Sequence, residues 1–493
     1  MRSSGILLPV ASLPSKYGIG CFSKEAYKFV DELKKAGQKY WQILPLGPTG
    51  YGDSPYQSFS TNAGNTYFID LEQLIKEGLL TQDECDETDF GDDEGVVDYG
   101  IIYKNRIKLL RKAYNRSNCD TNEEYLEFMD EEKHWLPDYA LYSAVKRYMN
   151  DRSWLEWDDD IRLRKEEALA KYKELLKDDI KFYQYIQFLF HQQWLGLKSY
   201  ANCKEIEIIG DIPIYVAMDS VDAWANPELF LFDEDVKPIA QAGVPPDGFS
   251  ETGQLWGNPL YDWEYHKKTG YKWWIKRIEH QRKLYDVIRI DHFRGLDEYY
   301  SIPIEDVTAE NGKWIKGPGL ELFEVLEEAL GELKIIAEDL GYLTPSVRKL
   351  LKDTNYPGMK VLQFAFDSRE ESDYLPHTYQ KRCVVYTGTH DNNTLRGWFK
   401  TMSREDRAYA LRYIGVKELK DDEIAKAFIR MAMSSVADLC VIPIQDYLNL
   451  SDEARINTPA TIGNNWIWRM KSDAIDDILL QEIRSITKLY GRL

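Results

Sequence analysis

Several features are scarce or absent in this sequence. Its six cysteines lie far apart and form no C-x-x-C pair, which argues against a zinc site and, in a chain of 493 residues, against a disulfide framework. No apolar run approaches the roughly 20 residues that a membrane-spanning helix needs. The apolar stretch 5–11 is too short for a signal peptide and contains Pro9. We therefore expect a cytoplasmic protein that crosses no membrane.

Positive charge is also in short supply. The formal net charge is −20, so the chain offers little to attract the phosphates of nucleic acids or an anionic membrane surface. No G-x-G-x-x-G motif follows the first expected strand and no Walker-type phosphate loop is present, which leaves a nucleotide-binding interpretation without its motif. A neutral substrate, with no nucleic-acid or membrane partner, fits this composition.

Aromatic residues, in contrast, are plentiful. They make up 13% of the chain, with 33 tyrosines and 14 tryptophans. Such rings pack in cores, and they also stack on the faces of sugars. Composition alone leaves both roles open.

Short apolar runs typical of strands alternate with helical periodicity along most of the chain. We expect eight strands, at 5–10, 40–46, 206–215, 287–295, 334–338, 359–366, 383–387 and 438–445. Strands separated by helices indicate parallel crossover units, and eight such strands favour an α/β fold of the (β/α)8 or TIM-barrel type. A doubly wound open sheet is the alternative.

Two stretches interrupt this alternation, one after the second strand and one after the third. We expect a barrel start with a substrate loop at 1–70, a helical insertion at 71–200, the third strand at 201–215, a loop-rich insertion with a mobile loop at 216–281, and the rest of the barrel with its acidic motifs at 282–493. Too few residues follow the eighth strand for a separate C-terminal β-domain.

The stretch 287–295 carries two opposite charges near the end of an expected strand. Side chains alternate along a strand, so Val287, Arg289 and Asp291 share one face. Ile288 and Ile290 then lie on the other face. A neighbouring guanidinium favours the ionised form of Asp291. Taken alone, such a pair is most often a structural ion pair.

Two further strand-like runs end in acids, Glu338 after 334–337 and Asp391 after 383–387. The carboxyl ends of parallel strands open on one face of a barrel, so we expect these acids to lie near Asp291. Two carboxyl groups with opposed protonation can serve as an ionised nucleophile and as a proton donor. Asp291 suits the first role. Glu338 suits the second, because burial and neighbouring carboxylates should raise its pKa.

The segments 289–295, 337–341 and 389–394 bring the motifs Arg-x-Asp, Glu and His-Asp in the order found in the α-amylase clan. In this form they closely resemble the amylomaltase family, the 4-α-glucanotransferases of glycoside hydrolase family 77, and the resemblance spans nearly the whole chain. It implies that Asp291 is the nucleophile, Glu338 the acid/base and Asp391 the transition-state stabiliser.

The resemblance also implies a set of substrate contacts. Tyr56 would stack on the sugar at the cleavage point, Asp211 would bind its hydroxyls, and Tyr51 would belong to a secondary glucan contact. Gln254 and Trp256 lie in what resembles a mobile acceptor-side loop. Completing the substrate-binding set are three further side chains that can hydrogen-bond sugar hydroxyls: Arg289, His292 and His390. Each histidine alone would more often be an ordinary packed residue.

One departure from the family is visible at the tip of the acceptor-side loop. It reads Asp247-Gly248-Phe249, where some relatives carry a second aromatic residue before the phenylalanine. The preference for acceptors therefore stays open.

By resemblance, the activity is transfer of an α-1,4-glucan segment to glucose or to another glucan, with retention and with no organic cofactor or metal. The implied partners are maltooligosaccharides and other α-1,4-glucans, within starch and glycogen metabolism. Two alternatives remain: an α-amylase-like hydrolase and a catalytically inactive glucan-binding scaffold. The presence of all three acids weighs against the scaffold.

Overall fold

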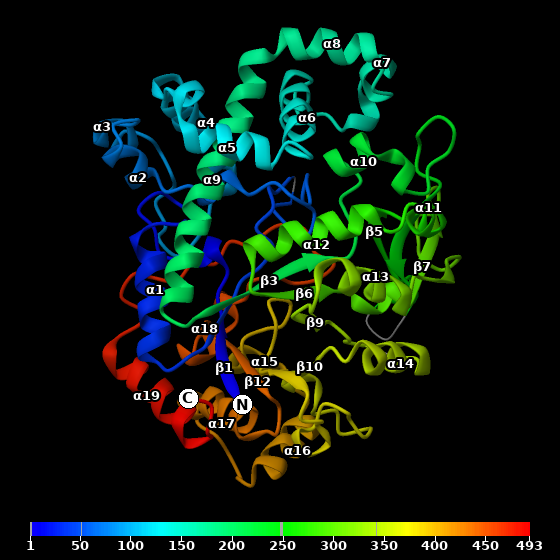
Figure 1. Ribbon diagram of the computed structural model, residues 1–493. Coiled ribbons are helices and arrows are strands. Elements are labelled where there is room, and N and C mark those ends of the chain that lie inside the picture. Colours follow the sequence, from blue (N-terminus) through cyan, green and yellow to red (C-terminus); the bar gives the residue numbers. More distant parts are fainter. Residues whose placement is uncertain (1, 51, 247–249, 342) are drawn as a thin grey trace.

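The computed structural model describes residues 2–50, 52–246, 250–341 and 343–493, and it confirms the expected barrel. Within these residues eight parallel strands close into one barrel with helices around it (Figure 1). Around the barrel the strands follow in the order β1 (Ser3–Leu7), β12 (Leu439–Pro443), β11 (Cys383–Tyr386), β10 (Gly358–Val361), β9 (Ile335–Ala337), β6 (Val287–Asp291), β3 (Glu207–Pro213) and β2 (Tyr40–Gln42). The sheet is closed, which excludes the doubly wound alternative.

Apolar side chains at alternate strand positions fill the inside of the barrel. Val287 of β6 packs there with Ile209 of β3 and Ile336 of β9. Ile288 and Ile290 belong instead to the larger core between the strands and the helices. This is the alternation predicted for the stretch that begins at Val287, and it directs Arg289 and Asp291 to the inner side of β6.

Helices cover the outside of the barrel. The first, α1 (Lys24–Lys35), begins where the Ser23 side chain accepts a hydrogen bond from the N–H of Glu25. The helix α14 (Pro345–Thr354) begins in the same way, because the Thr344 side chain accepts the N–H of Val347. The other helices that follow β3 are α10 (Val221–Ala225), α11 (Trp263–Lys268), α12 (Lys272–Leu284), α13 (Leu320–Leu330), α15 (Leu395–Thr401), α16 (Arg404–Ile414), α17 (Asp421–Ser434), α18 (Ile444–Tyr447) and α19 (Asp477–Leu489).

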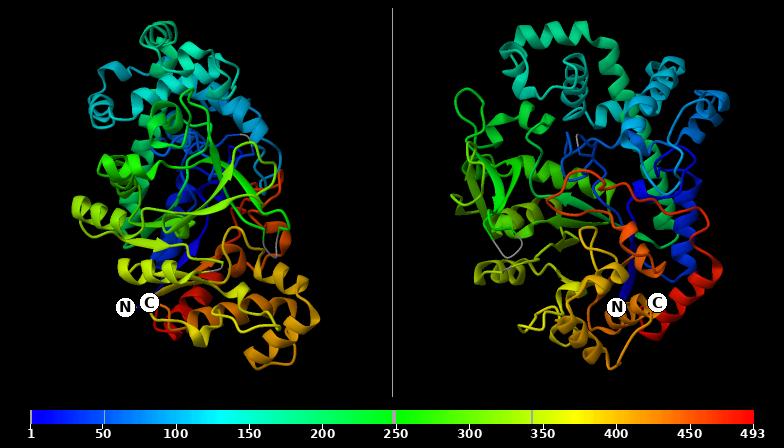
Figure 2. Two further views of the ribbon diagram at one scale, coloured as in Figure 1. Left: turned by 90° about the vertical axis from the view of Figure 1, so that its right-hand side faces the viewer. Right: turned by 180° about the vertical axis from the view of Figure 1, so that it is seen from behind.

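A group of helices follows β2 and extends from one end of the molecule, at the top of Figure 1 and in both views of Figure 2. It comprises α2 (Leu71–Lys76), α3 (Gln82–Asp86), α4 (Tyr99–Arg116), α5 (Glu123–Glu131), α6 (Leu136–Tyr148), α7 (Asp159–Arg162), α8 (Glu166–Leu175) and α9 (Lys177–Cys203). The long α9 returns the chain to β3, and Trp194 anchors it to α12 by donating to the carbonyl of Leu284 at 3.1 Å. The helical insertion is thus confirmed. No helix in the described ranges is long and apolar enough to cross a membrane.

An antiparallel sheet that the sequence pattern did not predict lies beside the barrel. Its strands lie in the order β5 (Gln254–Pro259), β4 (Ala240–Val244), β7 (Glu298–Pro303) and β8 (Lys313–Lys316). The segment 216–281 was expected to be rich in loops because it contains many turn-forming residues. Gly243 lies within β4 instead and allows a close approach of the neighbouring strand. A Cβ at Gly243 would lie 2.1 Å from the carbonyl oxygen of Gln254 on β5.

All eight barrel strands are shorter than predicted, and two of them show why. β2 ends at Gln42, before Pro45, which has no N–H to donate to a strand ladder. β10 ends at Val361, where the chain enters a 3-10 turn (Leu362–Phe364). Leu362 and Phe366 then pack with Phe428 of α17 in a second core cluster. An apolar run can therefore continue after the strand has ended.

Gly210 of β3 provides a test of how closely the barrel packs next to Asp211. A Cβ at this position would lie 2.1 Å from Cγ of the buried Tyr285. We expect Gly210→Ala to lower the free energy of unfolding by about 1–3 kcal/mol, measured by urea denaturation. The matched control is Gly196→Ala in α9, where the added Cβ would meet only the Tyr27 hydroxyl at 3.5 Å. The control should be neutral or stabilising; equal stability of both variants would contradict the packing argument.

Candidate active site

Arg289 lies at the centre of the charged groups inside the barrel. Only 3% of its surface is exposed. Its Nη1 donates to both carboxylate oxygens of Asp211, at 2.7 and 2.6 Å, and lies 3.0 Å from Oδ1 of Asp291. The Asp211 contact follows from strand pairing, because Asp211 of β3 and Arg289 of β6 are register partners. The predicted pairing of Arg289 with Asp291 is confirmed, and Asp211 joins it.

Glu338 follows β9 and reaches back toward β6. Its Oε2 accepts the backbone N–H of His292 at 2.7 Å, and its Oε1 accepts that of Leu340 at 2.8 Å. The pairing of β6 with β9 brings these groups together, since Ile290 and Ala337 are register partners. Two backbone donors thus fix the carboxyl group directly beside the end of β6.

Burial sets the protonation of both acids. It raises the pKa of Glu338 to about 7, and the charge of Asp291 acts in the same direction. This agrees with the prediction for Glu338. Burial also raises the pKa of Asp291 to about 6, against the opposing effect of Arg289. Arg289 thus favours the ionised form of Asp291, as expected, but the desolvation of the barrel interior is the larger effect and raises the pKa overall.

Asp391 lies in the loop after β11. Its Oδ1 accepts a hydrogen bond from Nδ2 of Asn457 at 2.6 Å and lies 3.4 Å from Nε2 of His390. Arg455 donates to the backbone carbonyl of Asp391 at 2.7 Å. The charge of Asp391 contributes to the raised pKa of Asp291, so the third acid belongs to the same electrostatic cluster.

Tyr56 connects the two sides of this cluster. Its hydroxyl donates to Oδ2 of Asp211 at 2.8 Å and lies 3.3 Å from Nδ1 of His390. Its ring stacks on the His390 ring, with the centroids 4.9 Å apart and the planes 20° apart. The loop at 47–70 therefore delivers an aromatic side chain to the acids.

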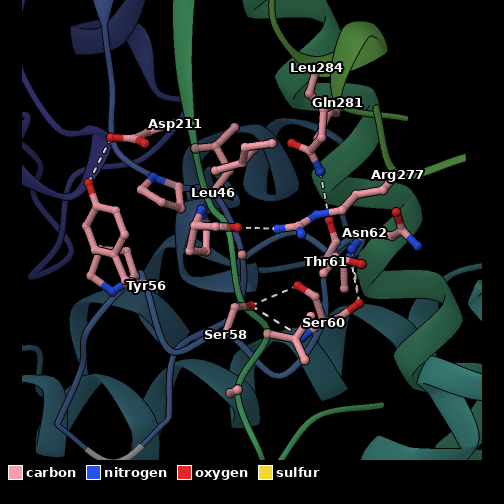
Figure 3. A pocket seen from close by; sticks show the side chains of 18 of the residues that line it. Leu46, Tyr56, Ser58, Ser60, Thr61, Asn62, Asp211, Arg277, Gln281 and Leu284 are labelled. Atoms are coloured by element: carbon pink, nitrogen blue, oxygen red, sulfur yellow. Dashed lines mark hydrogen bonds between the residues drawn. The ribbon is translucent and has the colours of Figure 1, made fainter. Parts of the chain in front are cut away.

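A pocket lies beside the hydrogen bond between Tyr56 and Asp211, whose side chains point toward one another in Figure 3. Its wall continues along Ser58, Ser60 and Thr61 to α12. Among the described residues that line it, none is Asp291, Glu338 or Asp391. The pocket thus adjoins the acidic cluster through Tyr56 and Asp211.

Trp256 and Gln254 lie on β5, next to His292. The Trp256 ring meets the His292 ring edge to face, with the centroids 4.8 Å apart, and its Nε1 donates to Oε1 of Gln254 at 3.2 Å. Burial lowers the pKa of His292 to about 3, so this imidazole is neutral at physiological pH. His292, whose backbone N–H bonds to Glu338, therefore carries a neutral ring packed against Trp256.

Sequence reasoning missed the contribution of the segment that follows α18. Asn457 and Arg455 bond to Asp391 as described above, and the Trp466 ring lies 5.9 Å from that of Tyr56 and 5.8 Å from that of His390. The only signal was a run of amide and turn-forming residues at 457–465. Tyr51, which was expected to contact glucan, and Phe249, at the tip of the acceptor-side loop, lie outside the described residues.

The arrangement suits acid/base and nucleophilic chemistry at a carbon atom between Asp291 and Glu338. The pKa of Glu338 is the higher of the two and backbone donors fix its carboxyl group, while the Asp291 side chain is 31% exposed, within reach of a substrate. Within the described ranges, no group of three or more His, Cys, Asp or Glu residues is arranged to hold a metal ion.

Comparison with known proteins identifies the family. A family model described as 4-alpha-glucanotransferase matches residues 8–475. The 4-alpha-glucanotransferase of Clostridium butyricum is 51% identical over 485 residues, covering 98% of this chain and 99% of the relative. That of Streptococcus pneumoniae is 48% identical over 495 residues, covering 100% and 98%. The structure of amylomaltase from Streptococcus agalactiae in complex with acarbose matches with a TM-score of 0.96 at 44% identity, covering 100% of both chains. The chain therefore belongs to the 4-alpha-glucanotransferases of glycoside hydrolase family 77 and has their transferase activity.

Proposed function

We propose that this enzyme transfers segments of α-1,4-glucans by a retaining double displacement in which Asp291, Glu338 and Asp391 are the catalytic residues. The observation that carries the proposal is the position of Glu338. Its carboxyl group accepts the N–H of the residue that follows Asp291, and its pKa is raised to about 7. A proton donor and a carboxylate therefore adjoin one another, which is the pair that a retaining mechanism needs.

In the first step the Asp291 carboxylate attacks the anomeric carbon while Glu338 gives its proton to the leaving glycosidic oxygen. The non-reducing segment is then bound covalently to Asp291, and the other product leaves. In the second step Glu338 takes a proton from an acceptor hydroxyl, which attacks the same carbon and releases Asp291. Two inversions retain the anomeric configuration.

The surrounding side chains would hold the donor and the acceptor. Asp391 and Asp211 are carboxylates beside Asp291 that can accept hydrogen bonds from sugar hydroxyls, and the Tyr56 ring offers an apolar face to the sugar. Trp256 and Gln254 would form the acceptor side next to His292. The secondary contact through Tyr51 remains a prediction.

We propose maltooligosaccharides and longer α-1,4-glucans as substrates, with glucose or glucan as acceptor. The amylomaltase of Streptococcus agalactiae in complex with acarbose supports a glucan-binding site of this type. A net charge of −20 is compatible with such neutral substrates. We place the enzyme in the cytoplasm, in starch and glycogen metabolism.

Incubation with maltotriose tests the reaction directly. We expect a ladder of longer oligosaccharides together with glucose, because a second sugar can intercept the glycosyl-enzyme before water does. The products are separated by size at several time points. Release of glucose and maltose alone would identify a hydrolase and overturn the proposal.

Replacement of Asp291 tests the nucleophile. We expect Asp291→Ala to lower turnover of maltotriose by on the order of 10⁴-fold, while glucan affinity measured by calorimetry changes little. The Arg289 guanidinium would keep its contact with Asp211, so the fold should persist. The matched control is Asp373→Ala, which removes a surface carboxylate paired with Arg348. Full activity of Asp291→Ala would remove this residue from the mechanism.

The pH dependence of kcat/KM follows from the two raised pKa values. The active form has Asp291 ionised and Glu338 protonated, so activity should be highest between about pH 6 and 7. It should fall at lower pH as Asp291 gains a proton and at higher pH as Glu338 loses one. Because Asp291 and Glu338 interact, the two apparent pKa values of the profile describe the pair and not either residue alone. A profile that stays flat from pH 5 to 9 would contradict the assignment.

A further inference from the structure

The loop that presents Asp391 begins at Thr387, directly after β11, and ends at Leu395, the first residue of α15. Part of this loop is already fixed by its own surroundings. A Cβ at Gly388 would lie 2.7 Å from Nε2 of Gln363, and the same nitrogen donates to the carbonyl of Asn393 at 2.7 Å. Contacts with Gln363 therefore restrict the backbone of this loop at Gly388 and at Asn393.

Asp446 joins the two ends of this loop. It lies in α18, just after β12, and exposes 2% of its surface. Its Oδ2 accepts the hydroxyl of Thr387 at 2.6 Å, and its Oδ1 accepts the backbone N–H of Leu395 at 2.8 Å. One carboxylate thus binds the residue that opens the loop and the residue that closes it.

We propose that Asp446 is a positioning residue for the transfer reaction, because its carboxylate fixes both ends of the loop that presents Asp391 to the substrate. The inference rests on the proposed role of Asp391. A small displacement of a group that acts at the reacting centre can lower the rate about 100-fold. Asp446 touches neither Asp291 nor Glu338 by hydrogen bond in the described structure, so it acts through the loop.

The raised pKa of Asp446 indicates that this residue has a role other than packing. Burial raises the pKa of this carboxyl group to about 6, above the ordinary value of about 3.9. Folding therefore favours the protonated form, and the ionised form costs stability once the pH rises above the ordinary pKa. An apolar side chain would avoid that cost, but it would leave the Thr387 hydroxyl and the Leu395 N–H without this acceptor.

Three variants separate positioning from mere stability. Asp446→Ala removes both contacts, and Thr387→Val removes the hydroxyl contact with little change in shape. We expect Asp446→Ala to lower kcat for maltotriose about 10- to 100-fold with little change in KM, at a temperature well below its unfolding midpoint. Asp446→Asn should restore most of the activity, because its amide oxygen can accept from Leu395 and its amide nitrogen can donate to Thr387 Oγ1.

A double-mutant cycle with Asp391→Ala shows whether the effect passes through Asp391. We expect Asp446→Ala to cause no further loss of kcat when Asp391 is already absent. Multiplied losses, or wild-type kcat in Asp446→Ala, would overturn the proposal. If Asp446→Ala fails to fold, Thr387→Val takes its place in the cycle, with an expected several-fold loss that also vanishes without Asp391.

The single variant Asp391→Ala is measured first, which keeps the two hypotheses apart. A large loss of kcat supports the role of Asp391 and makes the cycle interpretable. Full activity of Asp391→Ala would overturn the proposed role of Asp391, and the positioning role of Asp446 would fall with it. A large loss combined with independent effects in the cycle would overturn the role of Asp446 alone.

Discussion

The chemistry of this barrel depends on one buried cation. Arg289 lies between Asp211 and Asp291, and Asp211 exposes only 1% of its surface. A carboxylate in such a place is strongly unfavourable without a partner, and removing one member of a buried ion pair typically costs about 3–5 kcal/mol. A single guanidinium shared by two acids allows both to stay inside the barrel. Arg289 therefore allows the protein to fold with Asp211 and Asp291 close together inside the barrel.

The order of the strands then places these charged groups next to Glu338. Because β6 lies between β3 and β9, its Arg289 meets Asp211 on one side, and the N–H of His292 after its end meets Glu338 on the other. The neighbouring backbone, not a flexible side chain, holds the Glu338 carboxyl group. At the loop of Asp391 the arrangement is reversed, because the buried Asp446 carboxylate holds a backbone N–H at the far end of the loop. The acids are thus placed by the barrel itself.

The elements that local sequence patterns encode were predictable, and those that depend on distant contacts were not. The alternation in 287–291 and the cap at Ser23 follow from neighbouring residues, so they could be predicted. The antiparallel pairing of Ala240 with Pro303 and the bond from Asn457 to Asp391 join distant segments, which no local period reveals. The overall direction of the pKa shift of Asp291 was not predictable for a related reason. Sequence shows its charged neighbour, whereas the degree of burial appears only in the folded chain.

Burial also explains how the site keeps a protonated glutamic acid close to a histidine. A charged imidazole beside Glu338 would lower the pKa of that acid and draw water toward it. Burial instead lowers the pKa of His292 to about 3, and the Trp256 ring packs against this neutral imidazole. The residue whose backbone N–H bonds to Glu338 therefore carries an uncharged ring that packs against an aromatic side chain. Such a surface favours the faces of an incoming sugar over a water molecule, which is the discrimination that transfer requires.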